Sequence, residues 1–207
     1  AKGGKPIILG LVILLVIWAL SGLYRVLPDE QGVVLRFGKY SSTTDPGLHL
    51  KLPFFIDQVE KVPIRRQLKQ EFGFGTAGAT NIYQYSNVNT QQAEKSMVTG
   101  DSNVALVEWV VQYKVKDPKN YLFQVRRPDE TLRDASESIM REVVGDRTVD
   151  EVITFGRQEI EIEAKTKLQS LIDKYEMGIA IDLIQLKITL SLGLTFCTEL
   201  PISTTSA

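Results

Sequence analysis

The sequence predicts an α+β fold that follows a transmembrane helix, and three observations carry this prediction. Residues 7–24 form an apolar run without a charge. Residues 104–115 alternate in polarity with the period of a strand, and residues 128–176 repeat apolar side chains at helical spacing before a last alternating stretch. Because strands come first, helices next and a strand last, this order favours α+β over alternating βα units.

The apolar run is long enough to cross a bilayer. A helix of this length rises ~1.5 Å per residue to about 27 Å, close to the ~30 Å hydrocarbon core, and Val26 and Leu27 extend it beyond Arg25. Tyr24 beside Arg25 is typical of an interfacial anchor. We expect residues 1–6 to be a short cytoplasmic N-terminus and residues 7–27 to be a transmembrane helix.

A cleaved signal peptide is the alternative interpretation of the same run. Lys2 and Lys5 form a basic start, and residues 19–21 offer a small-x-small cleavage site. The run is longer than the ~7–15 apolar residues typical of a signal peptide, which favours an anchor.

The composition beyond the anchor is that of a globular domain. Hydrophobic residues make up 43% of the 207 residues and charged residues 24%, with a net charge of −1 and no blocks of one sign. This charge pattern excludes the basic surface expected of a nucleic-acid-binding protein. Cys197 is the only cysteine, so an intramolecular disulfide and a cysteine-rich metal site are excluded.

The first elements after the anchor are short strands. Residues 31–38 predict a strand closed by Gly38, and residues 45–47, Asp-Pro-Gly, predict a turn. Residues 48–52 then alternate leucine with His49 and Lys51, and residues 59–64 supply another strand. We expect a small antiparallel sheet close to the membrane.

The composition of the middle of the chain changes at two points. Residues 71–103 are rich in Gly, Thr, Asn, Gln and Ser, which predicts a long loop or partner-binding insertion. Residues 104–115 then predict a long strand with one buried side formed by its odd-numbered residues, while Glu108, Gln112 and Lys114 share the opposite face.

Three helices are predicted after Pro118. Residues 128–145 carry an apolar stripe and end at Gly145 as a cap, and residues 148–155 open with a capping box, Thr148 with Glu151. The longest helix covers residues 157–176. Its apolar stripe consists of Ile160, Ala164, Leu168, Leu171, Ile172 and Tyr175.

The same long helix carries two possible ion pairs at i,i+4 spacing, Glu161 with Lys165 and Glu163 with Lys167. Gly178 ends the helix. The last strand alternates from Ile179 to Leu183 and resumes its alternation one residue out of phase at Ile184, which predicts a β-bulge.

Several short motifs together resemble one family. The anchor followed by residues 28–39, Pro-Asp-Glu-Gln-Gly-Val-Val-Leu-Arg-Phe-Gly-Lys, then by Asp45-Pro46-Gly47-Leu48 and Pro53-Phe54, is similar to the start of SPFH (stomatin/prohibitin/flotillin) proteins. The motifs that narrow the resemblance to the HflK branch are Glu71-Phe72-Gly73-Phe74, Gly100-Asp101, Asp117-Pro118, Tyr121-Leu122-Phe123, residues 141–145 and Gly156-Arg157. The resemblance covers about residues 7–187.

The resemblance implies an SPFH, or prohibitin-homology, domain over residues 28–190 and a role in scaffolding and regulation rather than catalysis. It implies an HflC-like partner subunit, with which the chain forms a hetero-oligomer around the membrane protease FtsH. The implied location is a bacterial inner membrane, with the domain in the periplasm. A stomatin-like scaffold of lipid microdomains is the alternative, and a membrane-anchored hydrolase is a disfavoured alternative from another class.

The chain departs from the family pattern after Lys187. The family continues with a proline-containing turn and a long charged helix, whereas residues 191–207 contain Glu199 as their only charge and show no helical face. We expect this atypical tail to be truncated or out of frame.

No residue predicts a catalytic, cofactor-binding or metal site. His49 is the sole histidine, so a structural or surface role is favoured over metal binding. Alternation places Glu108 on the polar strand face as a solvated carboxylate. Gly73, Gly75 and Gly78 lack the Lys-Ser/Thr and the helix of a phosphate loop. Residues 54–55, both Phe, suit either the lipid headgroup region or ordinary core packing.

Overall fold

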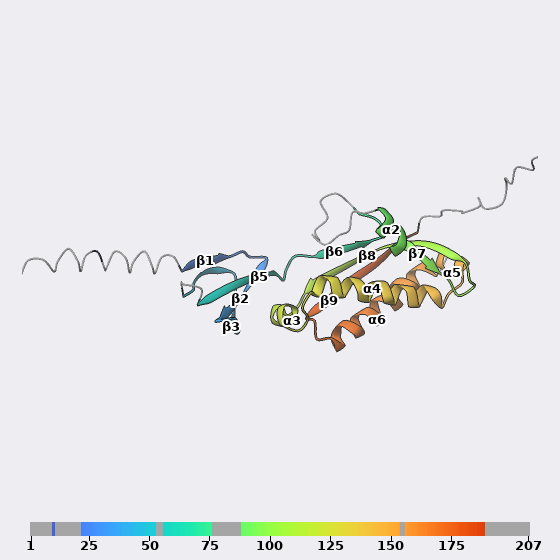
Figure 1. Ribbon diagram of the computed structural model, residues 1–207. Coiled ribbons are helices and arrows are strands. Elements are labelled where there is room, and N and C mark those ends of the chain that lie inside the picture. The colour runs from blue at the N-terminus through green and yellow to red at the C-terminus, as the bar shows by residue number, and fades with distance from the viewer. Residues whose placement is uncertain (1–9, 11–21, 53–55, 76–87, 154–155, 189–207) are drawn as a thin grey trace, which may run out of the picture.

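The computed structural model describes residues 10, 22–52, 56–75, 88–153 and 156–188 (Figure 1). These residues form two lobes along the chain. The small lobe, residues 22–63, consists of strands, and the large lobe, residues 68–188, combines strands with helices. Residues 64–67 connect them. The predicted α+β class is confirmed.

The small lobe contains two antiparallel sheets rather than the single sheet that we predicted. The first pairs β1 (Leu23–Val26) with β4 (Gly47–Leu50), and the second has the order β3-β2-β5, formed by Lys39–Thr44, Glu30–Arg36 and Asp57–Pro63. The predicted strands near residues 31–38 and 59–64 are therefore confirmed. Val33 and Val62 are buried in this lobe.

The end of the predicted transmembrane helix is wrong. Residues 23–26 form β1, whose backbone pairs with β4 so that Leu23 lies opposite Leu50 and Val26 opposite Gly47. Apolar side chains suit a strand as well as a membrane helix, so hydropathy did not mark this boundary. Residues 7–9 and 11–21 of the predicted helix lie outside the described residues, and none of the described helices is long and apolar enough to cross a membrane.

The large lobe is organised around β8 (Val104–Val115), which matches the predicted strand. It pairs with β6 (Leu68–Phe72), β7 (Ser96–Val98) and β9 (Ile179–Ile188), all antiparallel. The odd-numbered side chains of β8 are buried against the helices, as predicted, and Trp109 is fully enclosed. Figure 1 shows α4 and α6 running across this sheet.

The predicted loop over residues 71–103 is wrong in part. It contains the end of β6, all of β7 and α2 (Val88–Lys95). Phe72 is buried because it lies opposite Trp109 in the sheet, and α2 lacks an apolar stripe, which left no helical periodicity to detect. Residues 76–87 of this stretch lie outside the described residues, as do Phe54, Phe55 and residues 191–207.

The three predicted helices are confirmed except at their ends, as α4 (Pro128–Gly145), α5 (Val149–Ile153) and α6 (Arg157–Lys174). A further short helix, α3 (Pro118–Phe123), precedes them. The capping box before α5 is confirmed, since Thr148 N donates to Glu151 Oε2 at 3.0 Å. Gly145 is the last helical residue rather than a left-handed cap, and Asp146 takes the cap position with φ −84°. Tyr175 caps α6 and is exposed instead of belonging to its buried stripe.

The predicted bulge in β9 is confirmed, but it lies earlier than predicted. Gln112 pairs with Leu183 and Tyr113 with Ile181, so Asp182 is the extra residue. Leu183 is therefore on the exposed face, while Ile181 and Ile184 face the core. Leu183 and Ile184 are both apolar, so the sequence pattern alone did not show which of them faces the core.

A small apolar contact joins the lobes. Val33 and Val62 of the small lobe are buried together with Val115 at the end of β8. Tyr40 adds an edge-on ring contact with Phe123, 6.2 Å between centroids. The lobes are thus connected by both the linker and this contact.

Candidate interaction surfaces and buried polar clusters

The outer face of the β1–β4 ribbon is apolar and exposed. Its side chains come from cross-strand pairs, Leu23 with Leu50 and Arg25 with Leu48. Leu48 and Leu50 are 70% and 74% exposed. The alternation predicted for residues 48–52 is realised, with the leucines turned away from the protein. Such a cluster of exposed leucines marks a contact surface for another molecule or a membrane.

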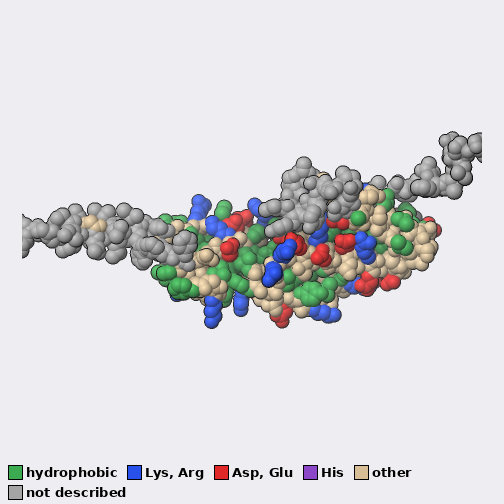
Figure 2. Space-filling view, viewed as in Figure 1, with side chains coloured by type: hydrophobic (Ala, Val, Ile, Leu, Met, Phe, Trp, Pro, Cys, Tyr) green, Lys and Arg blue, Asp and Glu red, His purple; other side chains and the backbone are tan. Residues whose placement is uncertain are grey.

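Phe37 is another exposed apolar side chain of the small lobe, at the tip of the β2–β3 hairpin. It is 78% exposed, in a left-handed conformation with φ 51°, and its N–H donates to the carbonyl oxygen of Ile56 at 2.8 Å. Leu52 is also exposed. Its N–H donates to Asp57, the residue that pairs with Arg36 next to Phe37. Figure 2 shows hydrophobic side chains gathered on the small lobe.

An ion pair fixes this end of the small lobe. Arg36 Nε donates to Asp57 Oδ1 at 2.9 Å, and Asp57 is buried. The hydrogen bond from Arg36, followed by that from the Leu52 amide, holds the pKa of Asp57 below its ordinary value. The hairpin base is thereby tied to the chain that follows β4.

His49 pairs with Tyr24 across the ribbon and lies on the face opposite to Leu48 and Leu50. Its Nε2 lies 2.7 Å from the carbonyl oxygen of Asp45, and its ring centroid lies 5.6 Å from that of Tyr24. No group of three or more His, Cys, Asp or Glu side chains suited to a metal ion occurs among the described residues. These contacts indicate that His49 stabilises the turn before β4.

The prediction of a solvated carboxylate at Glu108 is wrong. Glu108 lies on the predicted strand face, but it is only 8% exposed, and its Oε1 lies 3.5 Å from Nζ of Lys95. Lys95 ends α2, the helix that sequence reasoning missed. This helix covers part of the sheet face that was expected to be open.

A buried ion pair that the sequence did not reveal lies at the end of β6. Arg133 of α4 donates from Nε to Glu94 Oε1 at 3.2 Å and from Nη1 to the carbonyl oxygen of Glu71 at 3.2 Å. Glu94 Oε2 accepts from the N–H of Gly73 at 3.1 Å. Arg133 and Glu94 are both buried. The pair therefore ties β6, α2 and α4 to one another.

Aromatic stacking extends this cluster into the core. The Arg133 guanidinium carbon lies 4.6 Å from the ring centroid of Phe72, which stacks on Trp109 at 4.5 Å with an angle of 6°. Trp109 Nε1 donates to Ser136 Oγ at 3.1 Å. Only the apolar stripe around Arg133 hinted at its burial, and no local signal pointed to Glu94 as its partner.

A second polar cluster, half-buried, centres on Asp129 in the first turn of α4. The hydroxyls of Tyr113 and Tyr121 both donate to Asp129 Oδ1 at 3.0 Å. Burial, followed by the charge of Asp129, raises the pKa of Tyr113. The hydroxyl therefore stays protonated as a donor, and the cluster joins α3, α4 and β8 rather than presenting a reactive group.

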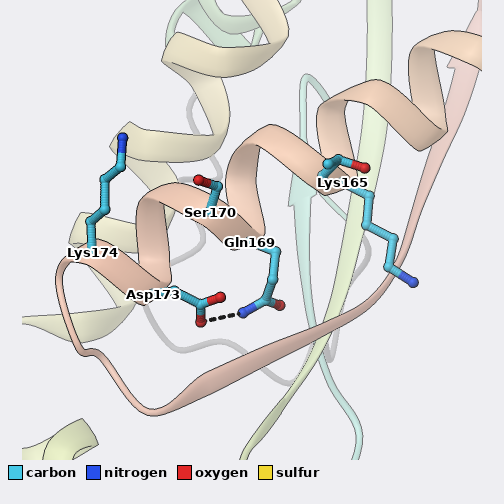
Figure 3. Close-up of a pocket in the computed structure, with 6 residues that line it drawn as sticks. Lys165, Gln169, Ser170, Asp173 and Lys174 are labelled. Atoms are coloured by element: carbon cyan, nitrogen blue, oxygen red, sulfur yellow. Dashed lines mark hydrogen bonds between the residues drawn. The ribbon is translucent and has the colours of Figure 1, made fainter.

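The outer surface of α6 carries a shallow hollow (Figure 3). Its lining residues are Lys165, Thr166, Gln169, Ser170, Asp173 and Lys174. All six come from one helix, and the Gln169 side chain donates to Asp173 Oδ1 at 2.8 Å. A hollow lined by one helix brings no groups from separate elements together, which is what a substrate site would need.

The chain matches the SPFH domain / Band 7 family over residues 24–190. This chain belongs to the SPFH family. The match includes both lobes, so the small lobe with its exposed leucines and the large lobe around β8 are parts of one family domain. The resemblance inferred from the motifs is confirmed.

The relatives of this SPFH chain include several HflK proteins. Protein HflK of Treponema pallidum is 36% identical over 182 residues, which cover 86% of this chain and 55% of that protein. Protein HflK of Borreliella burgdorferi is 35% identical over 182 residues, covering 88% of this chain and 56% of that protein.

A third relative carries a functional name. "Modulator of FtsH protease HflK" of Escherichia coli K12 is 36% identical over 179 residues, covering 86% of this chain and 38% of that protein. The SPFH chain thus spans about half the length of the first two relatives and less of the third. These comparisons confirm the narrower resemblance to the HflK branch.

Proposed function

We propose that this SPFH chain is a membrane scaffold that modulates the protease FtsH together with an HflC-like partner subunit. The observation that carries the proposal is the 36% identity, over 86% of the chain, to the Escherichia coli protein named as a modulator of FtsH. The assembly is a hetero-oligomer, in which the chain is the HflK-like subunit.

The proposed location is a bacterial inner membrane. A single apolar helix ending before β1 anchors the chain, with the N-terminus in the cytoplasm and the SPFH domain in the periplasm. The uncharged run in residues 7–22 and the exposed leucines of the β1–β4 ribbon support this arrangement, because the ribbon begins where the run ends. Leu48, Leu50 and Phe37 then contact the lipid headgroup region.

The proposed role is scaffolding rather than catalysis. The relative that is named by function is a modulator, and a hydrolase requires a nucleophile within hydrogen-bond reach of a base. The carboxylates of buried Glu94 and half-buried Asp129 are instead held by Arg133 and by two tyrosine hydroxyls. Their contacts connect elements of the fold.

Affinity purification tests the proposal most directly. The tagged full chain is expressed in a bacterium that carries FtsH and an HflC-like protein, and membranes are solubilised in mild detergent. Recovery of both proteins by mass spectrometry supports the proposed function. Recovery of homo-oligomers alone supports a stomatin-like scaffold without a protease partner and contradicts the FtsH role.

Membrane contact by the ribbon has a separate test. Leu50→Cys in a Cys197→Ser background is labelled with an environment-sensitive fluorophore and reconstituted in phospholipid vesicles. We expect a blue-shifted emission, because the exposed Leu50 position enters an apolar environment. Ser42→Cys, exposed on β3, is the matched control and should show a water-like spectrum. Identical spectra at the two positions would contradict lipid contact.

A further inference from the structure

Strand β9 has an edge that no described strand covers. Its backbone pairs with β8 along Ile179–Ile188, and among the described residues β8 is its only strand partner. A ten-residue strand with an open edge presents backbone N–H and C=O groups that can pair with another chain. Natural proteins generally block such edges.

Side chains of α6 reach this open edge. Gln169 acts like a strand backbone, since its Oε1 accepts from the N–H of Ile181 at 2.8 Å and its Nε2 donates to the carbonyl oxygen of Ile179 at 3.2 Å. Lys165 Nζ donates to the carbonyl oxygen of Asp182 at 2.7 Å.

Glu161, about one turn before Lys165 in α6, also contacts β9. Its Oε1 accepts from the N–H of Leu186 at 2.8 Å. The predicted pair between Glu161 and Lys165 is therefore replaced by two contacts to β9, whereas the predicted pair between Glu163 and Lys167 forms at 3.1 Å.

The spacing of these residues explains how a helix can follow a strand edge. Glu161, Lys165 and Gln169 are four residues apart, so they form one column with a rise of about 6.0 Å per step. The backbone groups that they reach lie in the reverse order along β9, at residues 179 and 181, then 182, then 186, so the column runs antiparallel to the strand with unequal steps along it. Figure 3 shows Lys165 and Gln169 on the side of α6 that faces the following strand.

We propose that the column Glu161, Lys165 and Gln169 closes the free edge of β9 against pairing with β9 of a second copy of this chain. The strand suits such self-pairing, because Asp182 lies in its first half and Lys187 in its second half, so an antiparallel pair of copies can set acid against base. Contacts between chains must then use other surfaces.

The test uses the full chain in detergent with two double variants. Lys165→Ala/Gln169→Ala removes two members of the column, and Thr166→Ala/Ser170→Ala, at exposed positions on the same helix, is the matched control. Hydrogen exchange should be at least roughly ten-fold faster at the Ile181 amide in the first variant and unchanged in the control. The Leu186 amide, held by the retained Glu161, is an internal reference.

Edge pairing itself is detected by crosslinking. Gln185→Cys, exposed on β9, is introduced in the Cys197→Ser background of the wild type and both variants. We expect intermolecular disulfides, and a larger mass by sedimentation, only when the column is removed. Gln169→Ala alone replaces the double variant if that one does not fold. Unchanged exchange at Ile181, or faster exchange without new crosslinks, would overturn the proposal.

Discussion

Arg133 brings several buried contacts together. It donates to Glu94 and to the backbone of Glu71, and it lies over the ring of Phe72. A buried charge is tolerated only with such partners, because desolvating it alone costs several kcal/mol. The contacts also fix α2, whose sequence has no apolar stripe to hold it in place.

Arg133→Ala should therefore lower the free energy of unfolding by about 3–5 kcal/mol, because it leaves the Glu94 carboxylate buried without its cation. Arg141→Ala is the matched control on the same helix, since Arg141 pairs with Glu137 at the exposed surface. Its cost should be below ~1 kcal/mol. Urea denaturation of the full chain in detergent, followed by tryptophan fluorescence, measures both. Equal losses would show that the buried pair does not stabilise the fold.

At the scale of elements, the turn from α6 to β9 depends on one glycine. Gly178 has φ +67°, and a Cβ at this position would lie 2.5 Å from the carbonyl oxygen of Asp117. The Gly178 carbonyl in turn accepts from the N–H groups of Lys116 and Asp117. The end of β8 and the start of β9 are thereby held together across this turn.

Gly178→Ala should destabilise the domain by at least about 1–2 kcal/mol, since alanine resists the left-handed conformation and clashes with Asp117. Gly145→Ala is the control, because Gly145 is helical and its nearest neighbour to an added Cβ is 3.8 Å away. It should leave stability unchanged or raise it by up to about 1 kcal/mol. Thermal unfolding monitored by circular dichroism compares the two, and a neutral Gly178→Ala would contradict the assigned turn strain.

The junction of α4 and α6 predicts a dependence on pH. Hydrogen bonds from Arg147 and then Lys167 hold the pKa of Glu163 below its ordinary value of 4.5. A lowered pKa in the folded state stabilises the protein above the ordinary pKa, and this contribution is lost as the pH falls through the folded-state value. The free energy of unfolding should thus decrease as the pH falls below 4.5.

Glu163→Gln should flatten this decrease, because the glutamine does not titrate. Urea denaturation between neutral pH and the acid range measures the slope for both chains. Glu137→Gln, at another surface ion pair, is the control with its own counter-ion Arg141. A slope that Glu163→Gln leaves unchanged would assign the acid sensitivity to other carboxylates.

At the scale of the molecule, the order of anchor, small lobe and large lobe predicts a topology. A reporter active only outside the cytoplasm, fused after Val115, should be active and bound to membranes. Recovery of the activity in a soluble fraction would indicate a cleaved signal peptide, and activity of a cytoplasm-only reporter would reverse the orientation.

The anchor itself is tested by charge. Arginine at Ile13 and at Val16 should impair insertion, since each central charge costs roughly 2.5–3.5 kcal/mol on insertion scales. Lys2→Arg, outside the apolar run, is the control that keeps the charge balance near the N-terminus. Normal membrane recovery of the Ile13→Arg/Val16→Arg chain would contradict a spanning role for this run.

The sequence by itself determined the elements whose apolar pattern is local and regular. The alternation in β8 and the helical stripes of α4 and α6 gave both their positions and their buried faces, and the motifs gave the SPFH family. Periodicity reports which side of an element is buried, and this information is complete within one element.

Only the tertiary structure decided what depends on distant partners. β1 became a strand because β4 pairs with it, α2 formed without an apolar stripe beside Arg133, and Glu108 was covered by Lys95. Glu161 and Lys165, a possible ion pair by their spacing in α6, instead bind backbone groups of β9. Local sequence fixes the groups that each residue offers, whereas hydrogen bonds and ion pairs form with whichever groups the fold brings within reach.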